Sequence, residues 1–349
     1  MPDTDLEPRS PRLGRLRGIG SFLLKAVVTS ALVVWLVRSG GLNFAALKLL
    51  WTNPLVACSG LLNFVLGFMF CSAWRWRLLL AALGVRLSLR HALGLQSIAG
   101  FFNFFVPGNV SGDLIKNHAV ADKDAGRLVA VTLVERVSGL IGLVWAAVPS
   151  LIYSGKTLVE HRGGGQLIAG VMTLFILSLV GPLIGYAVLR RLGNWESRST
   201  SQDVWARRVL HFLQAHVKSG TSTLLTLAAR PKVLLSAILV SLLMHSMAMV
   251  NFWIVARHLD NAEATFAQVA ALYPIGILSV MVPVSISGLG VGHVLFNELF
   301  RMLGLVRGAD VFNVHMFSSL FLSLSGAVVY LLRKGRAQTA QKSHSEVGL

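Results

Sequence analysis

Charged residues are scarce in this chain, and acidic residues are the scarcest. Only 13% of the 349 residues are charged, whereas roughly a quarter are charged in an average soluble domain. Apolar residues make up 54% of the chain, and the mean hydropathy is +0.66. So few charges could not keep this much apolar surface in solution, and this much apolar surface is incompatible with intrinsic disorder. The composition therefore indicates a polytopic membrane protein.

Cysteine is nearly absent as well. The chain has two cysteines, Cys58 and Cys71, and on one helix they would lie about 20 Å apart. A disulfide requires the two Cα atoms to lie within about 7 Å of each other, and two thiolates alone do not complete a zinc site. The sequence therefore predicts neither a disulfide-stabilised scaffold nor a zinc module.

Motifs that mark catalytic centres are also missing. The chain contains no G-x-S-x-G, H-E-x-x-H or G-x-x-x-x-G-K pattern, the marks of hydrolases, zinc proteases and phosphate-binding loops. The run Asp122-Lys123-Asp124 is a weak candidate, because paired carboxylates can hold a divalent metal; a solvated turn is the alternative. The sequence predicts no cofactor and no resident metal, and it argues against an enzyme without excluding one.

Long apolar runs, which the sequence has in abundance, divide it into candidate membrane spans. A helix of roughly 20 apolar residues crosses a bilayer, and runs of about this length are found at 21–37, 54–73, 128–152, 166–189, 233–256 and 311–332. Two further apolar segments, 93–115 and 266–298, are interrupted by Gly, Pro, Ser and Asn. No small-residue cleavage site follows the first run, so we expect an uncleaved helix rather than a signal peptide. The predicted fold is an all-α polytopic membrane protein with about six full spans and two broken helical hairpins.

Lysine and arginine indicate the orientation, because loops on the cytoplasmic side of a membrane are enriched in them. Basic residues gather in 1–20, 74–92, 190–232 and the tail after Leu332. We therefore predict that these segments, and hence both termini, are cytoplasmic. The formal charge of +17 then reflects contact with anionic lipid, not with nucleic acid.

The same basic loops determine how the broken segments run. Both 74–92 and 190–232 are expected inside, and two full spans lie between them, so 93–115 must begin and end on the cytoplasmic side. The same parity makes 266–298 begin and end outside. In the competing model both segments cross fully, which would place the basic loop 190–232 outside.

The two broken segments share a pattern that indicates an internal repeat. Residues Val106–Gly112 and Val282–Gly288 both read V-P-x-x-[VI]-S-G. The shift that superimposes the patterns also superimposes the flanking spans, which gives repeat halves of about 53–153 and 229–332. Such an inverted-topology repeat is the architecture of many secondary transporters; chance similarity of two turns is the alternative. The predicted organisation is a basic N-terminus (1–20), one transmembrane domain (21–335) with a cytoplasmic loop (190–232), and a cytoplasmic tail (336–349).

The turns of the two hairpins are the first candidate site. Unwound backbone is tolerated at membrane depth only where protein buries it or where it lines a wet cavity. Helix N-termini there carry unpaired N–H groups that suit a phosphate or carboxylate, and glycines allow a ligand to approach closely. The candidate binding residues at the two turns are Pro107, Gly108, Asn109, Ser111, Gly112, Pro283, Ser285, Ser287 and Gly288.

Ionisable residues within apolar segments are costly, so each is a functional candidate. Asp113 and Lys116 follow the first turn, Glu135 and Arg136 lie in the next span, and His293 follows the second turn. Arg136 or Lys116 could bind an anionic head group, and Glu135 could orient Arg136 or carry a proton. Lys116 is expected near an interface, where it can snorkel. The alternative is a purely structural ion pair between helices.

Several of these residues belong to segments with a family resemblance. Three sets of residues resemble the lysylphosphatidylglycerol synthase membrane-region family. They are Phe101–Gly108 followed by Ser111–Asp113 and Lys116, Glu135-Arg136 with Gly139-Leu140, and Pro283 with Ser287–Val291. The resemblance covers about residues 20–335, adds Asn103 to the candidate residues, and implies lipid translocation or a role in cell-envelope lipid chemistry.

The chain departs from the family pattern at a few positions. The family commonly has Gly-Gly-Asp and then Arg where this chain has Ser111-Gly112-Asp113 and Lys116. It commonly has Arg-Glu where this chain has Gly292-His293, so no charge role is carried over to the second turn. The soluble aminoacyl-transferase domain of the synthases is not part of this sequence, and lysine transfer to lipid is not expected.

The sequence thus leads to one principal functional prediction and to alternatives. We predict an inner-membrane lipid flippase or transporter that handles an anionic phospholipid or an isoprenoid-linked lipid, with membrane lipids as its partners. One alternative is a membrane enzyme for polyprenyl-phosphate sugar transfer that uses Asp122 and Asp124. Another is an accessory subunit of an envelope-biosynthesis enzyme.

Overall fold

The chain folds into a bundle of helices. The computed structural model describes residues 34, 38, 44–105, 111–120, 124–193, 217–280 and 288–333, and these contain no β-strand. The labelled elements are η1 (Phe44–Lys48), α2 (Leu49–Thr52), α3 (Pro54–Leu62), η2 (Asn63–Cys71), α4 (Ser72–Ala82), α5 (Leu89–Phe105), α6 (Ser111–His118), α7 (Ala125–Val159), α8 (Gly164–Gly193), α10 (Pro231–Arg257), α11 (Phe266–Val280), α12 (Val291–Met302) and α13 (Gly308–Ser323). Residues 217–228, which precede α10, are also helical.

Long apolar helices confirm the predicted class, an all-α polytopic membrane protein. The helices long and apolar enough to cross a membrane are Pro54–Ala82, Ala125–Tyr153, Gly164–Arg191, Pro231–Arg257 and Gly308–Arg333. They correspond to the last five of the six predicted spans. The first predicted span, 21–37, lies outside the described residues except for Val34.

The prediction of a basic loop at 74–92 was wrong. The helix that begins at Pro54 continues through α3, η2 and α4 to Ala82, and only residues 83–88 connect it to α5. Arg75 and Arg77 therefore lie on the helix. The helix continues beyond its apolar run because the Arg75 side chain pairs with the buried carboxylate of Glu135 and does not need to reach water.

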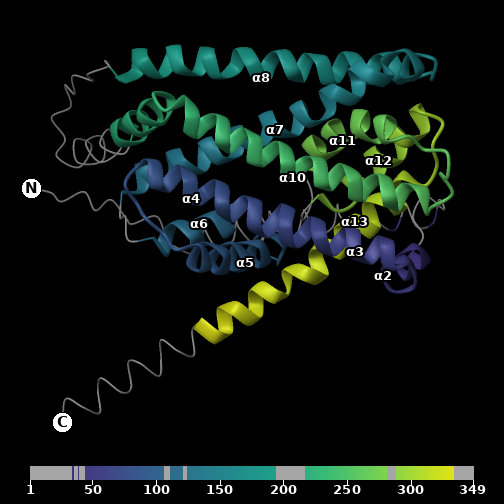
Figure 1. Cartoon of the computed structure of the whole chain (residues 1–349), viewed down its shortest axis with the longest axis horizontal. Coiled ribbons are helices and arrows are strands. Elements are labelled where there is room, and N and C mark those ends of the chain that lie inside the picture. The colour runs from purple at the N-terminus through teal and green to yellow at the C-terminus, as the bar shows by residue number, and fades with distance from the viewer. Residues whose placement is uncertain are drawn as a thin grey trace, which may run out of the picture.

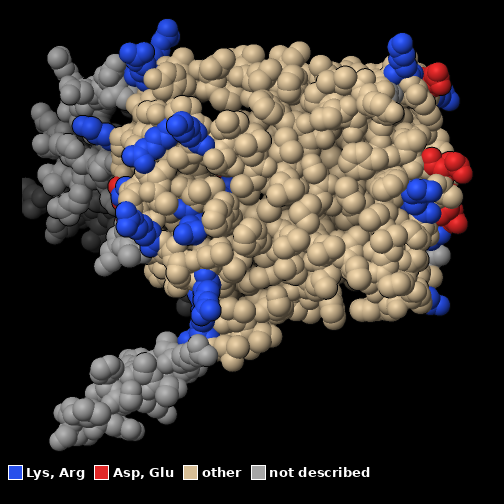
Figure 2. Space-filling view, viewed as in Figure 1, with Lys and Arg blue, Asp and Glu red and all other residues tan. Residues whose placement is uncertain are grey.

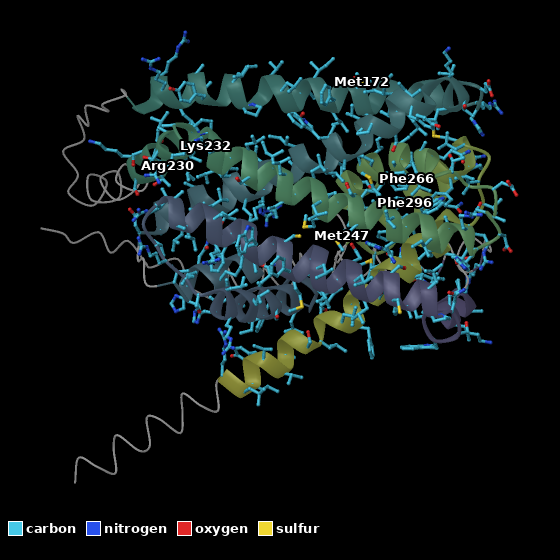
Figure 3. All side chains as sticks on the ribbon, in the orientation of Figure 1. Met172, Arg230, Lys232, Met247, Phe266 and Phe296 are labelled. Atoms are coloured by element: carbon cyan, nitrogen blue, oxygen red, sulfur yellow. The ribbon has the colours of Figure 1, made fainter. Side chains whose placement is uncertain are left out.

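On the face of the molecule that Figure 2 shows, charged side chains lie at the two ends of the bundle. Figure 2 shows Lys and Arg gathered at one end, both signs of charge at the other, and a band between them that is almost without charge. Arg230 and Lys232, where α10 starts, lie at the first end, and Phe266 and Phe296 lie toward the second (Figure 3). We call these the basic end and the mixed-charge end. The uncharged band has the character of a membrane-embedded surface.

The first broken segment forms a hairpin that opens at the basic end. Helices α5 and α6 run antiparallel (Figure 1). At the closed end, the backbone N–H of Gly112 donates to the Asn103 Oδ1 atom at 2.9 Å. At the open end, Ala92 and Val120 pack in one apolar cluster with Leu80, which is near the end of α4. The residues of the turn itself, 106–110, lie outside the described residues.

The second broken segment forms a hairpin that opens at the mixed-charge end. Helices α11 and α12 pack closely because Gly276 has no side chain; a Cβ there would collide with the ring of Phe296. The end of α12 meets the end of α7, where the Gly163 N–H donates to the Met302 carbonyl at 3.1 Å. Residues 281–287 lie outside the described residues. The two hairpins thus open in opposite directions; their origin in a repeat stays a prediction.

Helices α7 and α10 pack against each other in the middle of the bundle, and α8 lies along one side of it (Figure 1). Only 11% of the apolar window of α8 is buried. A hydrogen bond joins α8 to α7: the indole N–H of Trp145 donates to the Ser178 hydroxyl at 3.0 Å. Most of α8 is therefore free to contact lipid.

Candidate functional site

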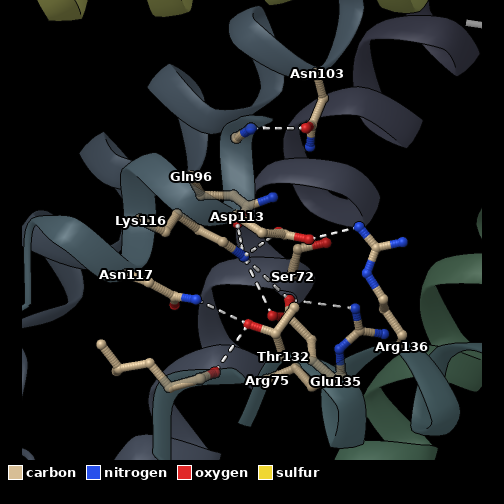
Figure 4. Close-up of polar contacts among 12 residues, drawn as sticks. Ser72, Arg75, Gln96, Asn103, Asp113, Lys116, Asn117, Thr132, Glu135 and Arg136 are labelled. Atoms are coloured by element: carbon tan, nitrogen blue, oxygen red, sulfur yellow. Dashed lines mark hydrogen bonds and ion pairs between the residues drawn. The ribbon is translucent and has the colours of Figure 1, made fainter. Parts of the chain in front are cut away.

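Five charged side chains meet beside the first hairpin and form what we call the charged cluster (Figure 4). Its members are Arg75 of α4, Asp113 and Lys116 of α6, and Glu135 and Arg136 of α7. Sequence analysis predicted four of them. The fold brings together residues from three helices, because the Lys116 side chain of α6 reaches Trp76 of α4 and Glu135 of α7.

Lys116 is at the centre of the charged cluster. Its Nζ atom lies 3.2 Å from Glu135 Oε2 and 3.5 Å from Asp113 Oδ1, and it donates to Gln96 Oε1 at 3.3 Å. The ammonium also lies 5.1 Å from the centre of the Trp76 ring, within the range of a cation–π contact. The side chain is 3% exposed, so the expectation that Lys116 snorkels to an interface was wrong. Three acceptors in fixed positions hold the ammonium inside instead.

Arg75 is the member that sequence analysis missed. Its Nη1 atom donates to the Ser241 hydroxyl of α10 at 2.6 Å, and its Nη2 atom lies 3.5 Å from Glu135 Oε1. Its Nε atom is buried and has no partner among the described residues. Gly139 leaves the necessary room, since a Cβ there would lie 3.3 Å from Nη1. The sequence did contain a signal for it. No helix-breaking residue separates the apolar run from Arg75 or follows it before Gly84, so the helix could be expected to continue through Arg75.

Arg136 is the most accessible member of the charged cluster. Its Nη2 atom lies 2.6 Å from Asp113 Oδ2, and 37% of its side chain is exposed. The cluster contains three cations and two carboxylates, so it carries one excess positive charge if all five are ionised. The adjacent turn, 106–110, contains no charged residue. The arrangement therefore suits a single anionic group that approaches beside Arg136.

The first turn is organised by contacts between its two helices. Asn103 Oδ1 accepts from the N–H of Gly112, which caps the first turn of α6. A Cβ at Gly112 would collide with the backbone carbonyl of Ala99. Helix packing thus already requires glycine here; a ligand contact stays a prediction. Ser111 begins α6, whereas Pro107, Gly108 and Asn109 lie outside the described residues.

The second turn contains neutral polar groups. Gly288 has a positive φ of 74°, which favours glycine, and it packs against Val280. His293 is 1% exposed; its Nδ1 accepts from the Gly290 N–H at 3.2 Å, so its Nε2 carries the proton and donates to Asn313 Oδ1 at 3.3 Å.

His293 is therefore held among α12 and α13 and takes no part in the contacts of the charged cluster. The Asn313 Nδ2 atom is buried and has no partner among the described residues. The candidates Pro283, Ser285 and Ser287 lie outside the described residues.

Asp124, from the weak metal motif, serves as a helix cap. Its Oδ1 accepts from the N–H of Arg127 at 3.2 Å, and its Oδ2 accepts from the Ser219 hydroxyl. Asp122 lies outside the described residues. Within the part of the chain that the structure describes, no group of three or more His, Cys, Asp or Glu side chains could hold a metal.

Comparison with known proteins links this site to a family. The family model described as Lysylphosphatidylglycerol synthase TM region matches residues 22–326, which include both hairpins and the charged cluster. No curated protein and no solved structure matches the chain. The family is a membrane family linked to lipid handling, so the protein is a multi-pass membrane protein with a lipid-related role. Because the match covers most of the sequence, the chain belongs to the lysylphosphatidylglycerol synthase transmembrane-region family.

Proposed function

We propose that this protein is a flippase that moves an anionic phospholipid or an isoprenoid-linked lipid across the membrane, and that the charged cluster binds the lipid head group. The observation that carries the proposal is the excess cation in a buried cluster. Glu135 lies ten residues into α7, which places it about 15 Å along the helix from its first residue. Charges at such a depth are stable only when they are paired. Two of the three cations would neutralise the carboxylates of Asp113 and Glu135. The charge of the third can then attract an anionic ligand.

The arrangement of the hairpins supports movement of the head group. They open at opposite ends of the bundle, and buried polar side chains lie between the charged cluster and the second hairpin. The Ser241 hydroxyl accepts from Arg75. Farther along α10, Asn251 Oδ1 contacts His315 Nδ1 at 2.8 Å, and Asn251 Nδ2 donates to the Ser59 hydroxyl. In the proposal, an anion is held strongly near the first hairpin and weakly near the neutral second one, which favours its release.

The proposed membrane is the inner, cytoplasmic one, with the basic end inside. Basic ends face the cytoplasm in most multi-pass proteins, and the charge distribution in Figure 2 supports this orientation. In this orientation the first hairpin opens to the cytoplasm, and the N-terminus and the C-terminus are cytoplasmic. Membrane lipids are the proposed partners, and an envelope-biosynthesis enzyme is a further one.

The alternatives predicted from the sequence gain no support from the described side chains. Asp124 is engaged as the N-terminal cap of α7. Metal-dependent turnover of a polyprenyl-phosphate sugar donor would favour the enzyme. Copurification with one synthase, without any retained lipid, would favour the accessory subunit.

The test compares Arg136→Gln with Arg136→Lys and with Arg86→Gln, an exposed arginine outside the charged cluster. Each protein is reconstituted in liposomes that contain fluorescent phosphatidylglycerol or fluorescent polyprenyl phosphate. Movement between leaflets is followed by chemical quenching of the outer leaflet. We expect transport by the wild type, loss in Arg136→Gln, partial retention in Arg136→Lys and normal transport in Arg86→Gln.

Thermal melting of the same proteins in detergent separates binding from folding. Arg136→Gln leaves Asp113 paired with Lys116, so the melting temperature should change little. A wild-type protein that moves neither lipid, or an Arg136→Gln protein with full transport, would contradict the proposal.

A further inference from the structure

A cavity lies at the basic end, separate from the charged cluster. Its volume is about 570 Å³, within the range of small-molecule sites. The turn at 81–84, the start of α7, the helical segment 217–228 and Arg230 supply its wall. We call it the interface cavity, because it lies where the uncharged band of the bundle ends.

Close packing of backbone segments builds the interface cavity. Gly84 has a positive φ of 85°, which lets the chain turn sharply after α4. The Arg127 guanidinium donates to the Leu83 carbonyl and so joins this turn to α7. The segment 217–228 crosses the start of α7 closely, since a Cβ at Gly220 would lie 3.3 Å from the Gly126 carbonyl oxygen. Contacts between backbone segments therefore determine the position of the wall.

The lining of the interface cavity suits a phosphate group. It includes the guanidinium groups of Arg127 and Arg230 and the hydroxyls of Ser222, Thr223 and Thr226. Guanidinium groups bind phosphate through paired N–H donors. The hydroxyls donate to helix carbonyls, and they can rotate to donate to a ligand instead.

The one carboxylate in the lining is already engaged. Asp124 accepts from the Arg127 N–H and from the Ser219 hydroxyl. Its charge offsets one of the two guanidinium groups, so the lining keeps one excess positive charge if all three groups are ionised. Arg230 is exposed, and its guanidinium makes no hydrogen bond or ion pair with the described residues. The start of α7 adds the positive end of a long helix dipole. The local field therefore favours an anion.

We propose that the interface cavity binds the phosphate of a ligand that carries further polar atoms. The ligand is either the head group of an anionic phospholipid or a soluble phosphate ester. Arg127 and Glu135 are eight residues apart on α7, so the interface cavity and the charged cluster differ in depth by about 12 Å. A lipid head group captured in the cavity would thus lie about two helical turns from the charged cluster. Phosphate binding here does not require that the protein transports lipid.

The experiment uses the full chain in a neutral detergent. Two probes are compared: radiolabelled inorganic phosphate, measured by equilibrium dialysis, and phosphatidylglycerol in mixed micelles, measured by native mass spectrometry. The test variants are Arg230→Gln and Thr223→Val. The matched control is Lys232→Gln, which removes the same charge two residues away and outside the lining. Melting temperatures verify that each variant is folded.

We expect Arg230→Gln to weaken binding about tenfold, as for one charge-assisted hydrogen bond partly screened by solvent. Thr223→Val should weaken it about threefold, as for one neutral hydrogen bond. If the two variants bind both probes more weakly, the result supports binding through the phosphate group that the probes share. Loss only for phosphatidylglycerol identifies a lipid head group, and loss only for inorganic phosphate identifies a soluble ester.

Two results would overturn the assignment. One is unchanged binding of both probes by Arg230→Gln. The other is an equal loss in Lys232→Gln, which would show general attraction to a basic surface. Binding that Arg136→Gln removes and Arg230→Gln spares belongs to the charged cluster, so the two sites succeed or fail separately.

Discussion

The two hairpins have similar shapes but very different polar groups. The first contacts the charged cluster, in which two carboxylates hold three cations. The second is held by neutral bonds from Gly290 to His293 and from His293 to Asn313. An ionised group at membrane depth costs far more than a neutral one when its partner is lost. In the proposed function, the first hairpin therefore binds the head group and the second assists its passage.

The largest expected effect comes from Glu135→Gln. Glu135 is the carboxylate that both Lys116 and Arg75 contact, so its neutralisation leaves two buried cations with too few partners. We expect a loss of about 3–5 kcal/mol in the free energy of unfolding. Thermal or denaturant unfolding in detergent measures it.

His293→Gln is the matched change at the second hairpin. It removes an imidazole that makes two neutral hydrogen bonds, and glutamine can replace one of them. The expected loss is about 1–2 kcal/mol. Equal losses in Glu135→Gln and His293→Gln would remove the contrast between the hairpins.

An effect smaller than that of Glu135→Gln is expected from alanine at the two turn glycines. Gly112→Ala would push a methyl group against the backbone of Ala99, and Gly288→Ala would strain a positive φ beside Val280. We expect each to cost about 1–3 kcal/mol, with the greater loss at Gly112, because a backbone carbonyl yields less than a side chain. Melting temperatures of the two variants, measured side by side, check this order. Gly165→Ala is the control, since nothing lies within 4 Å of a Cβ there.

The smallest effect is expected at the mixed-charge end. Arg307 donates to Asp260 at 2.6 Å and to Asp310 at 2.8 Å. Burial lowers the pKa of Arg307, but these two bonds outweigh it and raise the pKa above its usual value. Arginine thus stays charged over the accessible pH range, so raising the pH should not weaken these pairs. Arg307→Ala should cost about 1 kcal/mol, less at high salt; a salt-independent loss would indicate that the ion pairs contribute little.

Sequence periodicity predicted the spans well and their ends poorly. The five described spans were found because apolar runs of about 20 residues are rare outside membrane helices. The end of the first was misplaced at Arg75, since an arginine looks like the start of a loop until its buried partner is known. Asp113, Lys116, Glu135 and Arg136 were identified because charge is conspicuous in an apolar chain. Gln96 and Ser241, which complete their contacts, are ordinary polar residues that no pattern distinguishes.

By itself, the sequence determined the class of protein and the segments from which the site is built. Composition and hydropathy can be read from the chain without knowing which residues are neighbours. In a bilayer a long apolar run must form a helix, because its backbone polar groups have no water to bind. Only the tertiary structure decided that Lys116 is buried, that Arg75 joins the charged cluster and that His293 does not. Those outcomes depend on which helices become neighbours, because the cost of a charge at membrane depth is set by partners far away in sequence.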